Sequence, residues 1–278
     1  MKIAQYYDKK NSKLGLIDNG LLIPLDFQGD MIDLINTRRD IVISGDPVPV
    51  EDVRFAPVVT RPSKIIGIAF NYPSHFSESK WKRQVPDYPM IFAKFPNTLN
   101  HHRGLITWNA ALTDRVDYEG ELAVIIGKRI YECPEDRIME AIFGYACAND
   151  VSARNIQFKD SQIVRGKSLD TFCPLGPWIV TADEIPDPHS LNIRTLLNGQ
   201  VMQESNTSEM LFNLPRLISF LSMSFTLMPG DVILTGTPHG VGCFREPQLY
   251  MKDGDEVVVE IEGIGRLENR CRSYSGPI

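Results

Sequence analysis

The sequence lacks the features of secreted, membrane-spanning and nucleic-acid-binding proteins. None of its apolar runs approaches the ~18–20 residues that a transmembrane helix needs. Its first residues, MKIAQYYDKKNSK, carry charges before any signal-peptide core could form. The 29 Lys and Arg residues are outnumbered by 35 Asp and Glu residues, which gives a net charge of −6 and leaves no basic surplus for nucleic acid. We therefore expect a cytoplasmic protein with neither a membrane nor a nucleic acid as partner.

Cysteine pairs and glycine-rich cofactor loops are also missing. The five cysteines are far apart in the sequence and include no Cys-x-x-Cys pair, which excludes a zinc ribbon and a thioredoxin-type site. The glycines of residues 236–242 are not followed by Gly-Lys-Ser/Thr, and Gly263-Ile264-Gly265 lacks the third glycine of a dinucleotide-binding fingerprint. Scattered free cysteines suit a reducing compartment and a buried structural role.

The composition, with 43% apolar and 23% charged residues, is that of a globular protein long enough for one large or two unequal domains. Residues 1–60 are predicted to form a small N-terminal α/β domain, because short strand candidates flank an Asn19-Gly20 turn and precede a short helix over 31–39. A proline-rich connector between 47 and 62 marks the boundary. Residues 61–278 would then form the second domain.

The second domain is predicted to be mainly β, with two helical segments over 134–142 and 208–224, the latter kinked at Pro215. Strands and helices do not alternate regularly, which disfavours a doubly wound parallel sheet and favours a β roll or sandwich with a few packed helices. The expected strands cover residues 64–70, 90–95, 118–127, 144–149, 176–181, 192–199, 231–237 and 256–265.

The segment Val116–Gly127 holds two glutamates that could bind a metal. Residues two apart in a strand point the same way, so Glu119 and Glu121 share one face, while Gly120 leaves the other face bare for close approach of another segment. Two adjacent carboxylates repel each other unless a cation lies between them, and all-oxygen ligation suits Mg²⁺ or Mn²⁺ better than zinc. The alternative is a solvent-exposed acidic end of a strand.

A third carboxylate follows the small apolar run Tyr145–Ala148. Asp150 stands at the end of this predicted buried strand, where functional residues often lie, although it could equally be a helix cap. Arg154 and Gln157 are three residues apart, so one helical turn would point both the same way.

A candidate general base lies in the segment IAFNYPSHFSES. His75 and Glu78 are three residues apart after Pro73, and a histidine oriented by a carboxylate can accept a proton near neutral pH. Such a pair also occurs on surface helices with no catalytic role. Lys167 could contact a substrate oxygen or be a solvated loop lysine, and the glycine-spaced Thr235-Gly236-Thr237 turn could hold a carboxylate.

Taken together, these segments resemble the fumarylacetoacetate hydrolase family. The resemblance covers most of residues 62–270 in the order KIIGIAFNYPSH, PMIFAKF, VDYEGELAVIIGK, GYACANDVSARNIQ, GKSLDTFCPLGPWIVT, LNGQVMQESNTSEMLF and LMPGDVILTGTPHGVG. It implies an α+β, mainly β fold, in which the mixed β-sandwich roll of the family's C-terminal domain carries a small N-terminal appendage. It also implies a homodimer.

The resemblance assigns roles to the candidate residues. It implies that Glu119, Glu121 and Asp150 hold Mg²⁺, with Mn²⁺ or Ca²⁺ in some family members. It implies catalytic roles for His75, Glu78 and Lys167, and substrate contacts for Arg154, Gln157 and Thr237.

The implied activity is metal-dependent hydrolysis of a C–C bond in a β-diketo acid of the acylpyruvate or fumarylacetoacetate type, through an enolate. The alternatives with the same site are decarboxylation of oxaloacetate or another 2-oxo acid, and isomerisation of a hydroxy-dienedioate. A remote alternative is a non-catalytic dimer stabilised by the metal. In the enzymatic readings the substrate is a small anionic 2-oxo or diketo acid.

Overall fold

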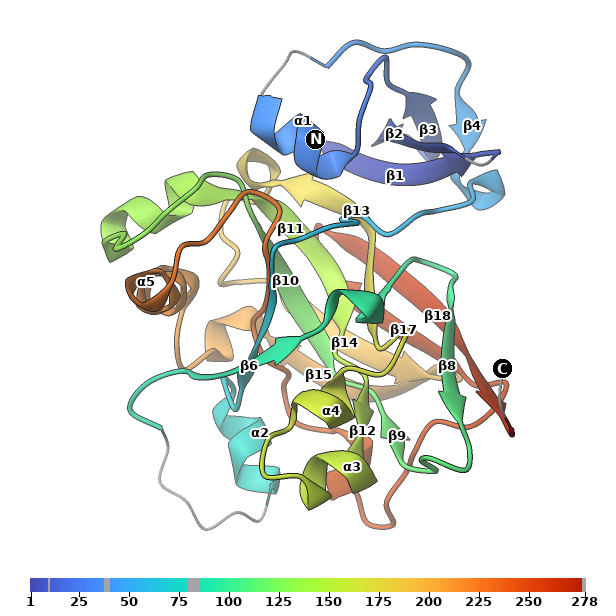
Figure 1. Ribbon diagram of the computed structural model, residues 1–278, viewed down its shortest axis with the longest axis vertical. Coiled ribbons are helices and arrows are strands. Elements are labelled where there is room, and N and C mark those ends of the chain that lie inside the picture. The colour runs from blue at the N-terminus through green and yellow to red at the C-terminus, as the bar shows by residue number, and fades with distance from the viewer. Residues whose placement is uncertain (10, 38–40, 80–85, 277–278) are drawn as a thin grey trace.

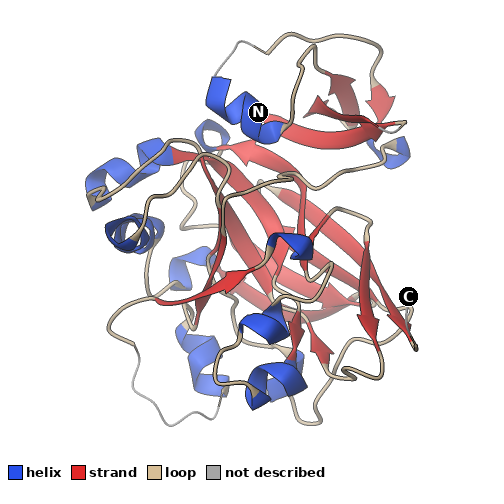
Figure 2. Cartoon of the chain, viewed as in Figure 1, coloured by secondary structure: helices blue, strands red, loops and turns tan. Residues whose placement is uncertain are grey.

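The computed structural model describes residues 1–9, 11–37, 41–79 and 86–276, and its body is a pair of packed β-sheets with short helices around them (Figures 1 and 2). The large sheet has eleven described strands. Its order is β4 (Val48–Pro49), β3 (Leu21–Pro24), β2 (Asn11–Asp18), β1 (Lys2–Asp8), β13 (Cys173–Thr181), β11 (Ile142–Asn149), β10 (Gly120–Ile126), β16 (Val232–Leu234), β5 (Ile65–Ala69) and β6 (Met90–Lys94), with β7 (Leu99–Asn100) paired to β13.

The smaller sheet packs against one face of the large one. Its order is β15 (Gln200–Asn206), β14 (Asn192–Leu197), β17 (Glu256–Ile261), β18 (Gly265–Tyr274) and β8 (Leu105–Asn109), and the short strands β9 (Val116–Asp117) and β12 (Ser152–Ala153) pair with each other. Most neighbours are antiparallel, but β16 and β5, β13 and β7, and β18 and β8 run parallel. The predicted β-sandwich roll is confirmed.

Alternation along β10 determines which side chains enter which core. Leu122, Val124 and Ile126 face the core between the two sheets, together with Val259 of β17. Ala123 and Ile125 face the opposite side, in a core that also holds residues of the N-terminal segment. Glu119 and Glu121 have the parity of Ala123, so they lie on the side of the large sheet that is turned away from the smaller sheet.

The N-terminal segment extends the large sheet. β1 pairs antiparallel with β13, and the predicted Asn19-Gly20 turn joins β2 to β3. α1 (Met31–Thr37) closes this end of the molecule, at the top of Figure 1. The division of the chain at residue 60 stays a prediction.

The two helical segments differ in detail from their predictions. The second begins only at Leu214, as α5 (Leu214–Ser224), since Asn213 caps it and Pro215 occupies its first turn, where a proline needs no hydrogen bond. The predicted kink at Pro215 is therefore wrong. The first is a 3₁₀ helix over Glu135–Ala141. No helix among the described residues is long and apolar enough to cross a membrane.

The remaining α-helices of the described residues are α2 (Pro73–Glu78), α3 (Arg154–Lys159) and α4 (Val164–Lys167), and they lie together at the end of the molecule opposite the N-terminal segment (Figure 1). They follow directly on β5, β12 and the loop after α3. β10 begins and β11 ends at this same end of the molecule. The side chains of α2, α3 and α4 therefore meet the polar residues at the ends of these two strands.

Candidate active site

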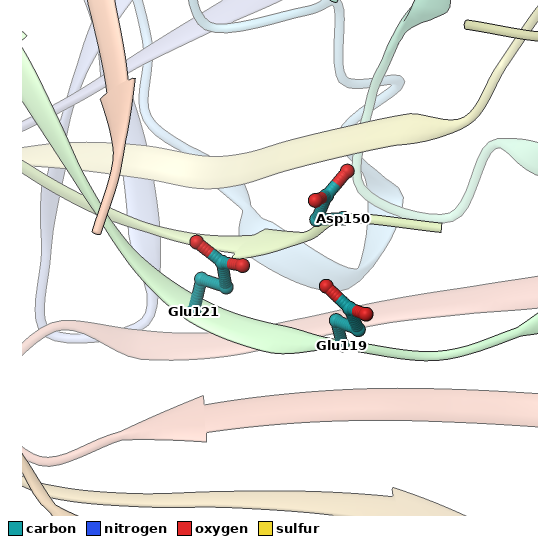
Figure 3. Close-up of side chains that lie close together, drawn as sticks. All are labelled: Glu119, Glu121 and Asp150. Carbon is teal, nitrogen blue, oxygen red and sulfur yellow. The ribbon is translucent and has the colours of Figure 1, made fainter. Parts of the chain in front are cut away.

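Three carboxylates converge where β10 begins and β11 ends. Figure 3 shows Glu119 and Glu121 rising from one strand and Asp150 from the end of its neighbour. One carboxylate oxygen from each lies within 4.8 Å of the others, and all three residues are buried, with exposed fractions of 5%, 1% and 0%. This burial excludes the alternative of an exposed acidic strand end.

Gly120 has no side chain, so the smaller sheet can approach β10 closely at this point, as the sequence predicts. A Cβ built on Gly120 would lie 2.0 Å from Oγ1 of Thr195 on β14. The sequence Glu-Gly-Glu thus places two acids on one face of β10 while the other face packs against the smaller sheet.

Three buried cations surround the carboxylates. Lys167 Nζ donates to Glu119 Oε2 and to Asp150 Oδ2, at 2.6 Å each. Lys94 Nζ donates to Asp150 Oδ1 at 2.6 Å and to the main-chain oxygen of Lys167. Arg154 Nη1 pairs with Glu119 Oε1 at 2.7 Å.

The three acids have unequal electrostatic surroundings. Burial by itself raises the pKa of Glu119, but Lys167 and Arg154 hold that pKa to about 2. Burial, together with the charges of Asp150 and Glu119, raises the pKa of Glu121 well above its ordinary value. The one hydrogen bond that Glu121 receives from the described residues comes from the Gly236 N–H, at 2.7 Å.

This arrangement fits a hard divalent cation. The donor set is entirely carboxylate oxygen, which Mg²⁺ and Mn²⁺ prefer, and no cationic side chain among the described residues pairs with Glu121. A buried carboxylate with a raised pKa beside two further carboxylates is stabilised most directly by a cation shared among the three.

His75 forms a dyad with Glu78 on α2. Its Nδ1 lies 2.7 Å from Glu78 Oε1, and Glu78 Oε2 accepts a hydrogen bond from Gly240 N at 2.8 Å. The imidazole stacks on Phe70 and leaves Nε2 without a hydrogen bond among the described residues. Glu78 therefore orients the ring and fixes the Nδ1–H tautomer, so that Nε2 is the atom that can accept a proton.

A cavity of about 740 Å³ is lined by one member of the carboxylate cluster, Glu119, and one member of the dyad, His75, whereas Glu121, Asp150 and Glu78 lie behind its wall. His75, Glu119, Arg154, Gln157, Lys167 and Thr237 all line it. Gln157 Oε1 accepts a hydrogen bond from Arg154 Nη1 at 3.0 Å, which places both on one face of α3 as their spacing predicts. The Thr237 hydroxyl donates to Gly120 O and accepts from Gln203 Nε2.

Sequence reasoning missed two buried charges in this site. Lys94 ends an apolar strand, and a lysine in such a run is itself a signal of a buried partner. Asp117 precedes Glu119 by two residues, so the strand alternation that groups Glu119 with Glu121 could also have indicated Asp117. Gln203, which connects Gly120 N to Thr237, had no sequence signal.

Comparison with known proteins decides the family. Residues 64–272 match the family described as fumarylacetoacetate (FAA) hydrolase, C-terminal. The chain belongs to the fumarylacetoacetate hydrolase family. The matched span contains all nine candidate site residues, and the resemblance found in the sequence is confirmed.

Similar members of the family include oxaloacetate tautomerases. The mitochondrial oxaloacetate tautomerase of Rattus norvegicus is 42% identical over 234 residues, which cover 84% of this chain and 74% of that protein. The oxaloacetate tautomerase of Bacillus subtilis is 39% identical over 222 residues, which cover 80% and 74%.

Solved structures of the family share the whole fold. The fumarylacetoacetate hydrolase of Exiguobacterium antarcticum superposes with a TM-score of 0.88 at 33% identity, over 99% of this chain and 100% of that chain. The 5-carboxymethyl-2-hydroxymuconate delta-isomerase of Mycobacterium smegmatis superposes over the same shares with a TM-score of 0.82 at 36% identity. Family members are thus enzymes acting on small organic acids. The expected homodimer and the cytoplasmic location stay predictions.

Proposed function

We propose that this chain catalyses keto–enol tautomerisation of oxaloacetate or a close relative, a dianionic 2-oxo acid. The observation that carries the proposal is the His75–Glu78 dyad: His75 lines the cavity together with Glu119, and its Nε2 has no hydrogen bond among the described residues. Tautomerisation needs one group that removes a proton from the carbon beside the oxo group and returns it to oxygen. The similarity to two oxaloacetate tautomerases supports this assignment.

Each site residue has a role in the proposed reaction that follows from its position. His75 Nε2 takes the proton from the substrate carbon, while Glu78 holds Nδ1–H and stabilises the imidazolium that forms. Lys167 and Arg154 keep Glu119 ionised, and Lys167 stands beside the developing negative charge. A divalent cation held by Glu119, Glu121 and Asp150 would supply a Lewis acid for the 2-oxo oxygen.

The charge balance of the buried site explains why a dianion would bind there. Four carboxylates (Asp117, Glu119, Glu121 and Asp150) face three cations (Lys94, Arg154 and Lys167), which gives 3 − 4 = −1 when all are ionised. With a divalent cation the same site carries +1, and a dianionic substrate then leaves −1. A bound divalent cation therefore makes the site attract a dianion more strongly than the metal-free site does.

Hydrolysis of a C–C bond in an acylpyruvate is the second candidate. Its support is the apolar part of the cavity wall, which an acyl chain could pack against and which includes Phe70, Phe92, Phe158, Ile163 and Phe244. His75 would then take its proton from a water rather than from carbon, and the acyl chain would occupy the apolar wall.

Activity measurements on the purified protein test both proposals. We expect disappearance of enol-oxaloacetate to accelerate with Mg²⁺ or Mn²⁺ and to return to the uncatalysed rate with excess chelator. A parallel assay follows acetylpyruvate hydrolysis. A protein that hydrolyses acetylpyruvate and leaves the enol of oxaloacetate at its uncatalysed rate would replace the first proposal by the second.

His75→Ala sharpens this test. We expect kcat to fall by about 10²–10⁴-fold, the usual contribution of a positioned general base, while metal affinity stays unchanged. His101→Ala is the matched control, because His101 does not line the cavity and its ring hydrogen-bonds to the main-chain oxygen of His102. Wild-type turnover in His75→Ala would remove this residue from the mechanism.

A further inference from the structure

Asp117 is a buried carboxylate whose hydrogen-bond partners among the described residues are main-chain N–H groups and Arg154. Its exposed fraction is 0%, and it accepts four hydrogen bonds. Oδ1 accepts from the N–H groups of Tyr118 (2.9 Å) and Gly242 (2.8 Å), and Oδ2 accepts from the N–H of Cys243 (2.9 Å) and from Arg154 Nε (2.8 Å). Engaged in this way, Asp117 is neither a metal ligand nor a base.

Close packing ensures that the loop over residues 241–245 meets this carboxylate. A Cβ on Gly242 would lie 1.8 Å from Leu249 O and 2.7 Å from Asp117 Oδ1, so only glycine allows the main chain to approach this closely. The same loop carries Phe244, which lines the cavity and lies against the His75 ring with 5.8 Å between ring centroids. Asp117 therefore connects the loop beside the proposed base to α3.

The Arg154 guanidinium is held on two of its three nitrogens. Nε binds Asp117 and Nη1 binds Glu119 and Gln157, whereas Nη2 is buried and has no hydrogen-bond partner among the described residues. Arg154 is 2% exposed and lines the cavity. A buried charged donor without a partner is costly, and an anionic ligand in the cavity would satisfy it.

We propose that Asp117 is a positioning residue, which fixes the Arg154 guanidinium so that Nη2 binds the second carboxylate of a dianionic substrate. The inference rests on the proposed function for the identity of that substrate. Selectivity for a dianion over the matching monoanion is then a property of the Asp117–Arg154 pair. A divalent cation held by Glu119, Glu121 and Asp150 would contribute to binding both anions, because both carry the first carboxylate.

Asp117→Asn tests this role because it keeps the size of the side chain and removes half of its accepting capacity. One oxygen can still accept from Tyr118 and Gly242, but the new amide nitrogen faces two donors, Cys243 N–H and Arg154 Nε. The guanidinium then loses one of its two anchors, while Nη1 still pairs with Glu119. The matched control is Asp231→Asn, since Asp231 is also fully buried and accepts from Ser63, Lys64 and Met228, outside the cavity.

Calorimetric binding to the Mg²⁺-loaded protein provides the measurement. The ligands are malate, an unreactive four-carbon dianion, and lactate, which lacks the second carboxylate. We expect Asp117→Asn to weaken malate binding about tenfold or more and to change lactate binding less than about twofold. Asp231→Asn should change neither. Equal weakening of both ligands in Asp117→Asn, or unchanged malate binding, would overturn the inference.

The double variant Asp117→Asn with Arg154→Met keeps the inference testable if the single variant folds poorly, because it removes one of the two facing donors. We expect its malate affinity to equal that of Arg154→Met alone, while an additional loss would contradict the proposed route through Arg154. Failure of the wild type to bind malate would also overturn the inference. Malate selectivity without any oxaloacetate turnover would instead contradict the proposed function alone.

Discussion

Buried carboxylates lie at both ends of the β10–β16 strand pair, and their surroundings differ sharply. Beyond one end, Asp231 accepts from Ser63 Oγ at 2.6 Å, from Lys64 Nζ at 2.6 Å and from two main-chain N–H groups. At the other end, Glu121 receives one N–H, from Gly236, and faces two further carboxylates. The first carboxylate has every requirement met within the described fold, and the second does not.

The difference separates a structural charge from a functional one. A buried carboxylate with four donors stabilises the segments that it connects, and its neutral replacement would weaken the fold. A buried carboxylate beside like charges makes the fold less stable than a neutral residue would. Its presence is therefore explained by a ligand, and the excess of negative charge at Glu121 marks the place where that ligand binds.

The largest effect is expected for Glu121→Gln. The amide removes a proposed metal ligand, so turnover should fall by about a thousandfold, equivalent to ~4 kcal/mol of transition-state stabilisation. Because the amide also removes an unpaired buried charge, the metal-free variant should unfold at the same or a higher temperature than the wild type. Activity assays with a Mg²⁺ titration, and thermal unfolding in chelator, measure the two effects.

Glu119→Gln is the matched control for that variant. Glu119 is paired with Lys167 and Arg154, so its replacement should lower both turnover and the unfolding temperature of the metal-free protein. Equal losses of thermal stability in the two variants would show that Glu121 has a partner equivalent to those of Glu119, and the comparison between the two ends would fail.

A smaller effect, on stability alone, is expected for Asp231→Asn. Losing the charge-assisted hydrogen bonds to Ser63 and Lys64 should lower the free energy of unfolding by about 2 kcal/mol, while kcat stays that of the wild type. Urea denaturation and steady-state kinetics check the two halves of this statement. A fall in kcat without a fall in stability would make Asp231 part of the functional site.

The sequence predicted the contents of the site better than the contacts within it. Strand parity placed Glu119 and Glu121 together, and the His75–Glu78 spacing on a short helix predicted their contact. Both depend on the regular period of one element. Pairing across the chain has no such period, so neither Lys94 with Asp150, 56 residues apart, nor Arg154 with Asp117, 37 residues apart, was foreseen.

The fold shows the same limit. The β-sandwich class follows from the strand candidates, and the predicted Asn19-Gly20 turn forms a hairpin. The pairing of β1 with β13 joins residues that are almost 180 positions apart, and no local pattern encodes it. The start of α5 at Leu214 was not predicted, because hydropathy alone cannot distinguish a proline that kinks a helix from one that occupies its first turn.

The smallest effect concerns the pH dependence of metal stabilisation. Glu121 keeps its proton in the metal-free fold up to a pKa above the ordinary 4.5, because burial and then Asp150 and Glu119 raise that pKa. The unfolded chain loses the proton near 4.5, so the metal-free fold becomes less stable as pH rises from there to the raised pKa.

A divalent cation takes the place of the proton, so the rise in unfolding temperature on adding Mg²⁺ should grow with pH. Scans from about pH 5 to about pH 8, with and without Mg²⁺, measure this slope. Glu121→Gln should abolish it, and an equal slope in that variant would assign the titration to another group.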